Sequence, residues 1–167
     1  MKELKILFLA AVCTASSAVF AIEVPQQVQA AFDKVCPDVA DEAWSADEGY
    51  YVATFNQNQF ETKLWFDGQG NWVMEQVDWE TMSEAPAAIF NAFAAGQYSG
   101  NEVQDVVQIQ YPQRETMVAV LVGTPNEESG YMLLYNENGE LIEADAVSIS
   151  GSNCLGACNL LECAVED

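Results

Sequence analysis

The feature that most constrains this chain is an internal repeat, in which a helix-like pattern followed by strand-like patterns occurs twice. The segments 24–32 and 85–93 both have proline at their second position and an Ala-Phe pair at their end. Proline suits the first turn of a helix, where its missing N–H costs nothing. Pro37 and Gly96 then follow as stop signals. The sequence therefore predicts two related helices. Their apolar faces consist of Val28, Ala31, Phe32 and Val35 in the first and Ile89, Ala92 and Phe93 in the second.

After each helix the apolar period changes from helical to alternating, which is typical of antiparallel strands. The expected strands are 49–56, 60–67 and 71–77 in the first unit and 103–111, 115–123, 131–135 and 140–144 in the second. In both units an aromatic strand end, Phe66 or Tyr135, precedes a glycine-closed turn. An amphipathic helix and a one-faced sheet each need a cover. We therefore expect an α+β fold of two tandem helix-plus-antiparallel-sheet units, with one helix packed on each sheet.

The first residues have the order of a secretory signal: Lys2 and Lys5, an apolar run over 6–12, and small residues up to Ala21. The apolar run is too short to span a bilayer, and we expect no membrane span in the mature chain. An alternative is that Cys13 is a lipidated first residue.

These patterns divide the chain into four segments and predict a periplasmic or secreted protein. The segments are a signal peptide at 1–21, a first unit at 22–82, a second unit at 83–147 and a cysteine-containing tail at 148–167.

The chain has 26 acidic and five basic residues and a net charge of −21. Removal of the signal peptide leaves Lys34, Lys63 and Arg114 as its basic residues. A polyanion is repelled by phosphates and has few groups to bind them, which argues against nucleic-acid partners. A basic protein partner, divalent cations or simple solubility all fit the charge.

Four cysteines remain after export, namely Cys36, Cys154, Cys158 and Cys163. An even number in an oxidising compartment predicts up to two disulfides, although three pairings are possible. A thiolate metal site is the alternative. The spacing of the last three is not that of a zinc site, and the chain has no histidine to complete one.

Several residues in the first unit resemble one known family. Trp44, the Tyr50-Tyr51 pair and the run from Phe66 to Trp72 through Asp67 and Gly70 follow the helix that begins near Pro25. This order resembles the PepSY-like domains described as β-lactamase-inhibitor-like. The second unit resembles a more divergent copy, and the similarity extends over 24–147. The resemblance implies an exported, non-enzymatic domain that binds or restrains another protein, such as an enzyme. It transfers no catalytic residues and no cofactor.

The residues themselves also argue against catalysis. The absence of histidine excludes Ser/His/Asp and Cys/His nucleophile systems, and no glycine-rich phosphate loop is present. We therefore expect no enzyme activity, no cofactor and no metal site. Two alternatives stay open: a small hydrolase that depends on a pair of carboxylates, and an acidic protein that binds divalent ions.

The candidate partner-binding residues are Trp65, Trp72, Tyr50 and Lys63. Trp65 and Lys63 lie on the same face of their strand, opposite Leu64 and Phe66. If that face is open, Trp65 is an exposed anchor for a partner, since tryptophan is enriched at the centres of interfaces. If the second unit or the tail covers the face, Trp65 belongs instead to a core shared by the two units.

Overall fold

The computed structural model describes residues 22–124 and 129–149 of the chain. The expected signal peptide and the three cysteines of the tail lie outside these residues. The segment boundary that we expected at 82/83 falls between the fourth strand and the second helix. The division of the chain into four segments stays a prediction.

Two helices form where the proline signals predict them. Pro25 is the N-cap of α1 (Gln26–Val35), and Pro86 is the N-cap of α2 (Ala87–Ala95). Each helix buries two apolar side chains one turn apart, Val28 and Phe32 in α1, Ile89 and Phe93 in α2. Val35, which we expected on the buried face, is the last residue of α1 and is 56% exposed.

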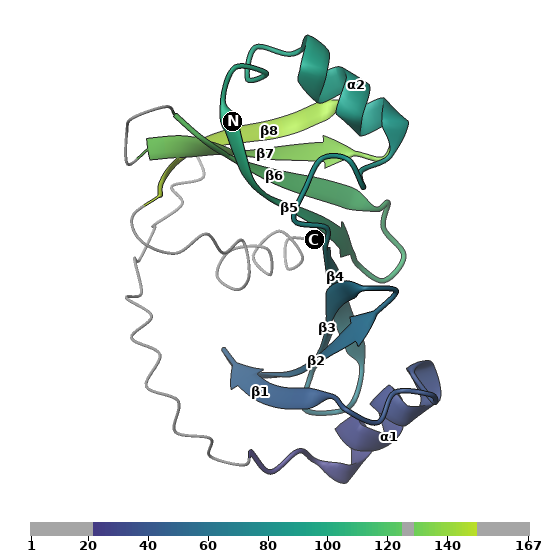
Figure 1. Ribbon diagram of the computed structural model, residues 1–167. Coiled ribbons are helices and arrows are strands. Elements are labelled where there is room, and N and C mark those ends of the chain that lie inside the picture. Colours follow the sequence, from purple (N-terminus) through teal and green to yellow (C-terminus); the bar gives the residue numbers. More distant parts are fainter. Residues whose placement is uncertain (1–21, 125–128, 150–167) are drawn as a thin grey trace.

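The described residues form eight strands. They are β1 (Ala43–Asp47), β2 (Tyr50–Gln57), β3 (Phe60–Phe66), β4 (Trp72–Asp78), β5 (Glu102–Gln110), β6 (Met117–Gly123), β7 (Ser129–Asn136) and β8 (Leu141–Ser148). Every strand pairs antiparallel with the next along the chain, which gives a single sheet in the order β1-β2-β3-β4-β5-β6-β7-β8 (Figure 1).

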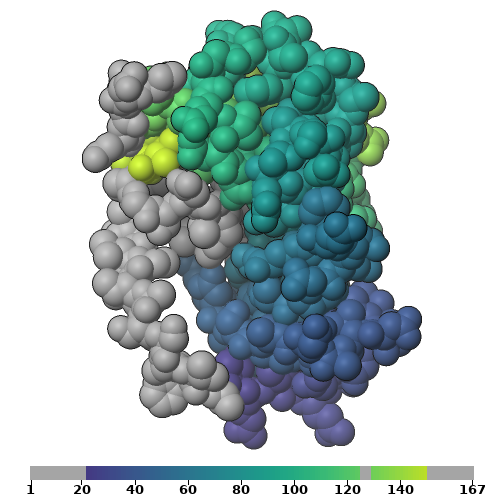
Figure 2. Space-filling model, in the orientation of Figure 1, coloured from purple at the N-terminus to yellow at the C-terminus, as the bar shows by residue number. Residues whose placement is uncertain are grey.

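The predicted fold class is therefore wrong. We expected two tandem units, each with its own sheet, but β4 pairs with β5 from Glu75↔Gln110 to Asp78↔Val107 and joins the strands into one mostly β structure. Pairing satisfies backbone groups that two separate sheets would leave open at their edges. In Figure 2 the two halves of the chain meet without a break between the α1 end and the α2 end of the molecule.

Two turns anchor the helices to the sheet in the same way. Gly70 has a φ of +84° and Gly139 a φ of +81°. A Cβ at either position would lie 2.6 Å from a carbonyl oxygen in the first turn of a helix, that of Gln27 for Gly70 and that of Ala88 for Gly139. Only glycine combines this backbone conformation with such a close approach.

Side-chain oxygens close both turns. Asp67 Oδ1 accepts hydrogen bonds from the N–H groups of Gln69 and Asn71, each at 2.9 Å. Asn136 Oδ1 accepts from the N–H groups of Asn138 and Glu140, at 3.0 and 2.9 Å. The Asp67 oxygen is thus engaged in the glycine-closed turn that the sequence predicts after Phe66.

The two faces of the sheet differ. Leu64 and Phe66 of β3 pack against α1, and strand pairing places Val118 and Val120 of β6, which pack in the α2 cluster, on the same side. Both helices therefore cover one side, and we call the opposite side the helix-free face. In Figure 1 the sheet bends so that the helices lie at the two ends of its outer side.

Candidate partner-binding surface

An apolar cluster runs along the helix-free face across both halves of the sheet. Its buried members are Val52, Trp65, Met74, Val107, Ile109, Tyr111, Ala119 and Leu134. These residues come from strands β2 to β7 and from the residue that follows β5. Tyr50, Val73 and Met117 pack against it and are partly buried. The face therefore has a continuous apolar centre that neither half could build alone.

Trp65 is a buried member of this cluster and is only 2% exposed. Its indole Nε1–H donates a hydrogen bond of 3.3 Å to Oε1 of Gln76, which is itself buried. Pairing of β3 with β4 sets Trp65 beside Met74. Of the two alternatives for Trp65, the structure favours a core shared by both halves.

The other candidate residues do not all join Trp65. Tyr50 is partly buried against the same cluster, and Lys63 lies two residues before Trp65 on the same face. The Lys63 ammonium pairs with the Glu61 carboxylate at 3.1 Å. Trp72, in contrast, packs in the α1 cluster on the opposite side of the sheet. Three of the four candidates thus share a face, and their partner-binding role stays a prediction.

Two carboxylates at the β8 edge of this face were not singled out from the sequence. Register places Glu143 beside Leu134 and Asp145 beside Met132, so both carboxylates are on the helix-free face. Burial, the charge of Asp145 and a hydrogen bond with it raise the pKa of Glu143. The alternation of β8 would have indicated the pair, but only once the partner strand and its register were known.

Cys36 is the one disulfide candidate among the described residues. It is a free, half-buried thiol at the C-cap of α1. Burial, followed by the nearby negative charge of Glu75, raises the pKa of this thiol. Burial also raises the pKa of Glu75. Because Cys154, Cys158 and Cys163 lie outside the described residues, the disulfide pairing stays a prediction.

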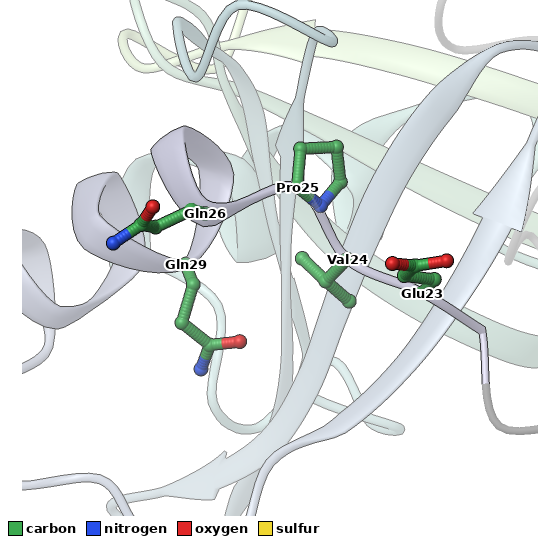
Figure 3. Close-up of a pocket in the computed structure, with 5 residues that line it drawn as sticks. All are labelled: Glu23, Val24, Pro25, Gln26 and Gln29. Atoms are coloured by element: carbon green, nitrogen blue, oxygen red, sulfur yellow. The ribbon is translucent and has the colours of Figure 1, made fainter.

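A surface depression of about 540 Å³ lies where the chain enters α1. Its lining residues are Glu23, Val24, Pro25, Gln26 and Gln29. Figure 3 shows that these side chains spread apart and do not converge on a common point. Glu23 is the single carboxylate among them, so the depression lacks the pair of facing acids that glycosidase-type chemistry uses.

Within 22–124 and 129–149, no group of three or more His, Cys, Asp or Glu residues is arranged to hold a metal ion. In the same part of the chain, neither helix has the length and hydrophobicity that crossing a membrane requires.

Comparison with known proteins identifies relatives of the whole fold. A family described as "Putative beta-lactamase-inhibitor-like, PepSY-like" matches residues 49–143. The crystal structure of a DUF2874 family protein from Bacteroides uniformis is 50% identical, covers 77% of this chain and 94% of its own, and has a TM-score of 0.73. Among curated proteins, none matches the sequence.

Two further crystal structures carry informative descriptions. One, from Bacteroides eggerthii and described as "putative periplasmic proteins", is 44% identical, covers 75% of this chain and 91% of its own, and has a TM-score of 0.71. The other, a BLIP-like protein from Bacteroides fragilis, is 28% identical, covers 80% of this chain and 92% of its own, and has a TM-score of 0.71. The family match extends over more than half of the chain, and it confirms the resemblance seen in the sequence. The chain therefore belongs to the PepSY-like, beta-lactamase-inhibitor-like family.

Proposed function

We propose that this protein is a non-catalytic module of the cell envelope that binds another protein across the helix-free face of its sheet. The observation that carries the proposal is the apolar cluster on that face. Strands of both halves contribute to it, and both described helices lie on the other side. An antiparallel sheet that faces water on one side normally keeps that side polar. The buried apolar residues at the centre of this face therefore support a role in packing against another surface.

The relatives and the charge support the location and the type of partner that we propose. The BLIP-like relative has an inhibitor-type name, and another relative is described as periplasmic. An exported module that binds a protein, such as an enzyme, is consistent with both. With a net charge of −21, the protein attracts a basic partner and repels an acidic one. The acidic edge formed by Glu143 and Asp145 is placed to steer such a partner onto the face.

Neutralising that edge tests the proposal. The double variant Glu143→Gln/Asp145→Asn removes two charges from the helix-free face. The control Asp33→Asn/Glu84→Gln removes two charges from exposed positions on α1 and just before α2. We expect the first variant to capture a basic partner from an envelope extract several-fold less well than the wild type, mainly through slower association. The control should match the wild type.

Equal losses in the two double variants would mean that total charge and not the helix-free face decides binding. No loss in either variant would contradict a role for the acidic edge. Measuring association rates at two salt concentrations separates steering from contact, because steering weakens as salt screens the charges.

A further inference from the structure

The outer side of α2 is apolar and uncharged, although it is exposed. Residues 85–101 contain no charged side chain, in a chain that has 26 acidic and five basic residues. The exposed positions of α2 carry alanine, phenylalanine and asparagine, and Phe90 is 46% exposed. A helix that is apolar all round is usually buried. The outer side of α2 therefore has the composition of a contact surface.

The first helix provides an internal control for this observation. The repeat aligns the buried residues of the two helices, Val28 with Ile89 and Phe32 with Phe93, so both helices meet the sheet in the same way. The exposed positions carry different residues. Aligned and exposed in both helices are Gln26 with Ala87, Gln27 with Ala88, Asp33 with Ala94 and Lys34 with Ala95. Packing on the sheet therefore does not require an apolar outer side, and the reason for the one on α2 lies outside the fold of a single chain.

The charge of the protein decides which partner fits this surface. A basic partner gains affinity from the acidic parts of the protein and none from a surface without charge. A second copy of the chain has the same net charge of −21, so it is repelled wherever acidic side chains face each other. That repulsion is smallest where neither copy carries a charge. The stretch between Glu84 and Glu102 meets this condition.

We propose that two copies of this chain associate through the outer sides of their α2 helices. A two-fold interface brings the same patch of both copies together, so the patch must be self-complementary. Phe90 beside exposed alanines meets this requirement, because the ring of one copy fits over the small side chains of the other. Asn91 is exposed on the same helix, and its amide both donates and accepts hydrogen bonds, so two such amides pair well across a two-fold axis.

The position of α2 makes this association independent of the proposed function. The helix lies at the end of the molecule away from α1 and packs on the side of the sheet opposite the helix-free face (Figure 1). A second copy on α2 therefore does not occlude the helix-free face of either chain. A helix of nine residues offers a small contact. Interfaces that bury less than about 1,200 Å² are usually weak, so we expect a dissociation constant in the micromolar range.

Sedimentation equilibrium of the mature chain tests the proposal. Reducing agent is present throughout, so that no disulfide links two copies. We expect a monomer–dimer equilibrium whose dissociation constant falls several-fold from low to high salt, because salt screens the repulsion between two acidic copies. Capture of a basic partner has the opposite salt dependence. Failure of the dimer and failure of the proposed function are therefore distinguishable.

Two aspartate variants form a matched pair. Phe90→Asp and Val35→Asp each add one negative charge at an exposed apolar position of a helix, the first on α2 and the second on α1. A two-fold interface contains the substituted residue twice, so we expect Phe90→Asp to raise the dissociation constant by about tenfold or more. Val35→Asp adds only net charge and should stay within about twofold of the wild type. Thermal unfolding checks that both variants fold.

A crosslinking measurement keeps the proposal falsifiable if Phe90→Asp fails to fold. Ala87 and Gln26 are exposed and uncharged at equivalent places of α2 and α1. A benzophenone amino acid at position 87 should give a covalent dimer of the chain, whereas the same group at position 26 should give none.

Four results would overturn the proposal. They are a monomer at all concentrations, equal weakening by the two aspartate variants, a dimer that high salt dissociates, and a covalent dimer that forms from position 26 as readily as from position 87. Binding of the wild type to phosphatidylcholine vesicles without dimer formation would also overturn it, and would assign the outer side of α2 to a lipid surface.

Discussion

The two halves of the molecule share the same order of helix, strands and turn, but different side chains form their cores. Each has a helix with a proline N-cap, followed by four strands and a glycine-closed turn against the helix. In the α1 half, Phe32 makes edge contacts with the rings of Trp44, Phe55 and Phe66, at centroid distances of 5.4 to 6.5 Å. The α2 half packs mainly aliphatic side chains around its helix. The turn and cap geometry is therefore conserved between the halves while the core chemistry is free to change.

The outer faces of the helices differ as well. The outer side of α1 carries charged and amide side chains, including Asp33 and Lys34. Residues 85–101, which contain α2, have no charged side chain in a protein of net charge −21, and Phe90 is 46% exposed there. A helix that is apolar all round is usually buried. The amphipathic pattern that identified α1 was thus a weaker guide to α2, where the proline and the repeat were the better signals.

Removing the central phenylalanine of each helix should have the largest effect and should separate the two cores. Phe→Ala in a core costs about 3–5 kcal/mol, and each aromatic pair adds about 0.5–1.5 kcal/mol. Because Phe32 has three aromatic neighbours and Phe93 is 8% exposed among mainly aliphatic ones, we expect Phe32→Ala to lower the free energy of unfolding by about 4–5 kcal/mol. Phe93→Ala should lower it by about 3 kcal/mol. Chemical denaturation of both variants measures the difference, and equal losses would mean that the aromatic contacts add nothing.

The glycine-closed turns should respond alike, because their geometry is the same. Gly70→Ala and Gly139→Ala each force a side chain into a left-handed conformation and against a helix carbonyl. We expect a loss of about 2 kcal/mol or more in each case. Gly68→Ala is the control, since nothing lies within 4 Å of its added Cβ, and it should stay within about 0.5 kcal/mol of the wild type. A large loss of stability in only one of these two variants would contradict the equivalence of the two turns.

The pH dependence of stability should show a smaller effect. It arises from two carboxyls with raised pKa values, Glu75 in the α1 half and Glu143 in the α2 half. Both start from an ordinary value of 4.5, Glu75 raised by burial and Glu143 by burial together with Asp145. Above pH 4.5 the folded state keeps these protons longer than the unfolded state does. Stability therefore falls as the pH rises from 4.5 through each raised pKa. Glu75→Gln should remove the Glu75 part of this dependence.

Salt distinguishes the causes at the two sites. It screens the charge of Asp145 but does little to burial. A carboxyl NMR titration in low and high salt should therefore show a lower pKa for Glu143 in high salt and a nearly constant one for Glu75. A pKa of Glu75 that drops as far as that of Glu143 would mean that a charge, and not burial, raises it.

Local signals explain most of what the sequence could predict. Proline, glycine and apolar spacing act over a few residues, so they placed both helices, the two turns and seven strands to within a few residues. The pairing of β4 with β5 could not be found in this way, because it depends on backbone hydrogen bonds between segments that carry no common side-chain signal. The fold class was wrong for that reason.

The candidate site shows the same division between local and long-range information. Alternation in β3 correctly put Trp65 and Lys63 opposite Leu64 and Phe66. Alternation gives the side of a sheet but not what lies over it, so the burial of Trp65 was left open. For Trp72, the register shift between Trp65 and Phe66 in the β3–β4 pair decides the side, and that irregularity has no clear sequence mark.

The central claim is that the partner contacts the helix-free face and not the helix side, and photo-crosslinking from one residue on each side tests it most directly. Glu61 is exposed on the helix-free face and Asp33 is exposed on α1. Replacing either with a benzophenone amino acid removes the same charge. In the intact envelope, we predict an intermolecular adduct from position 61 and none from position 33. An adduct from position 33 alone, or from neither position, would contradict the account.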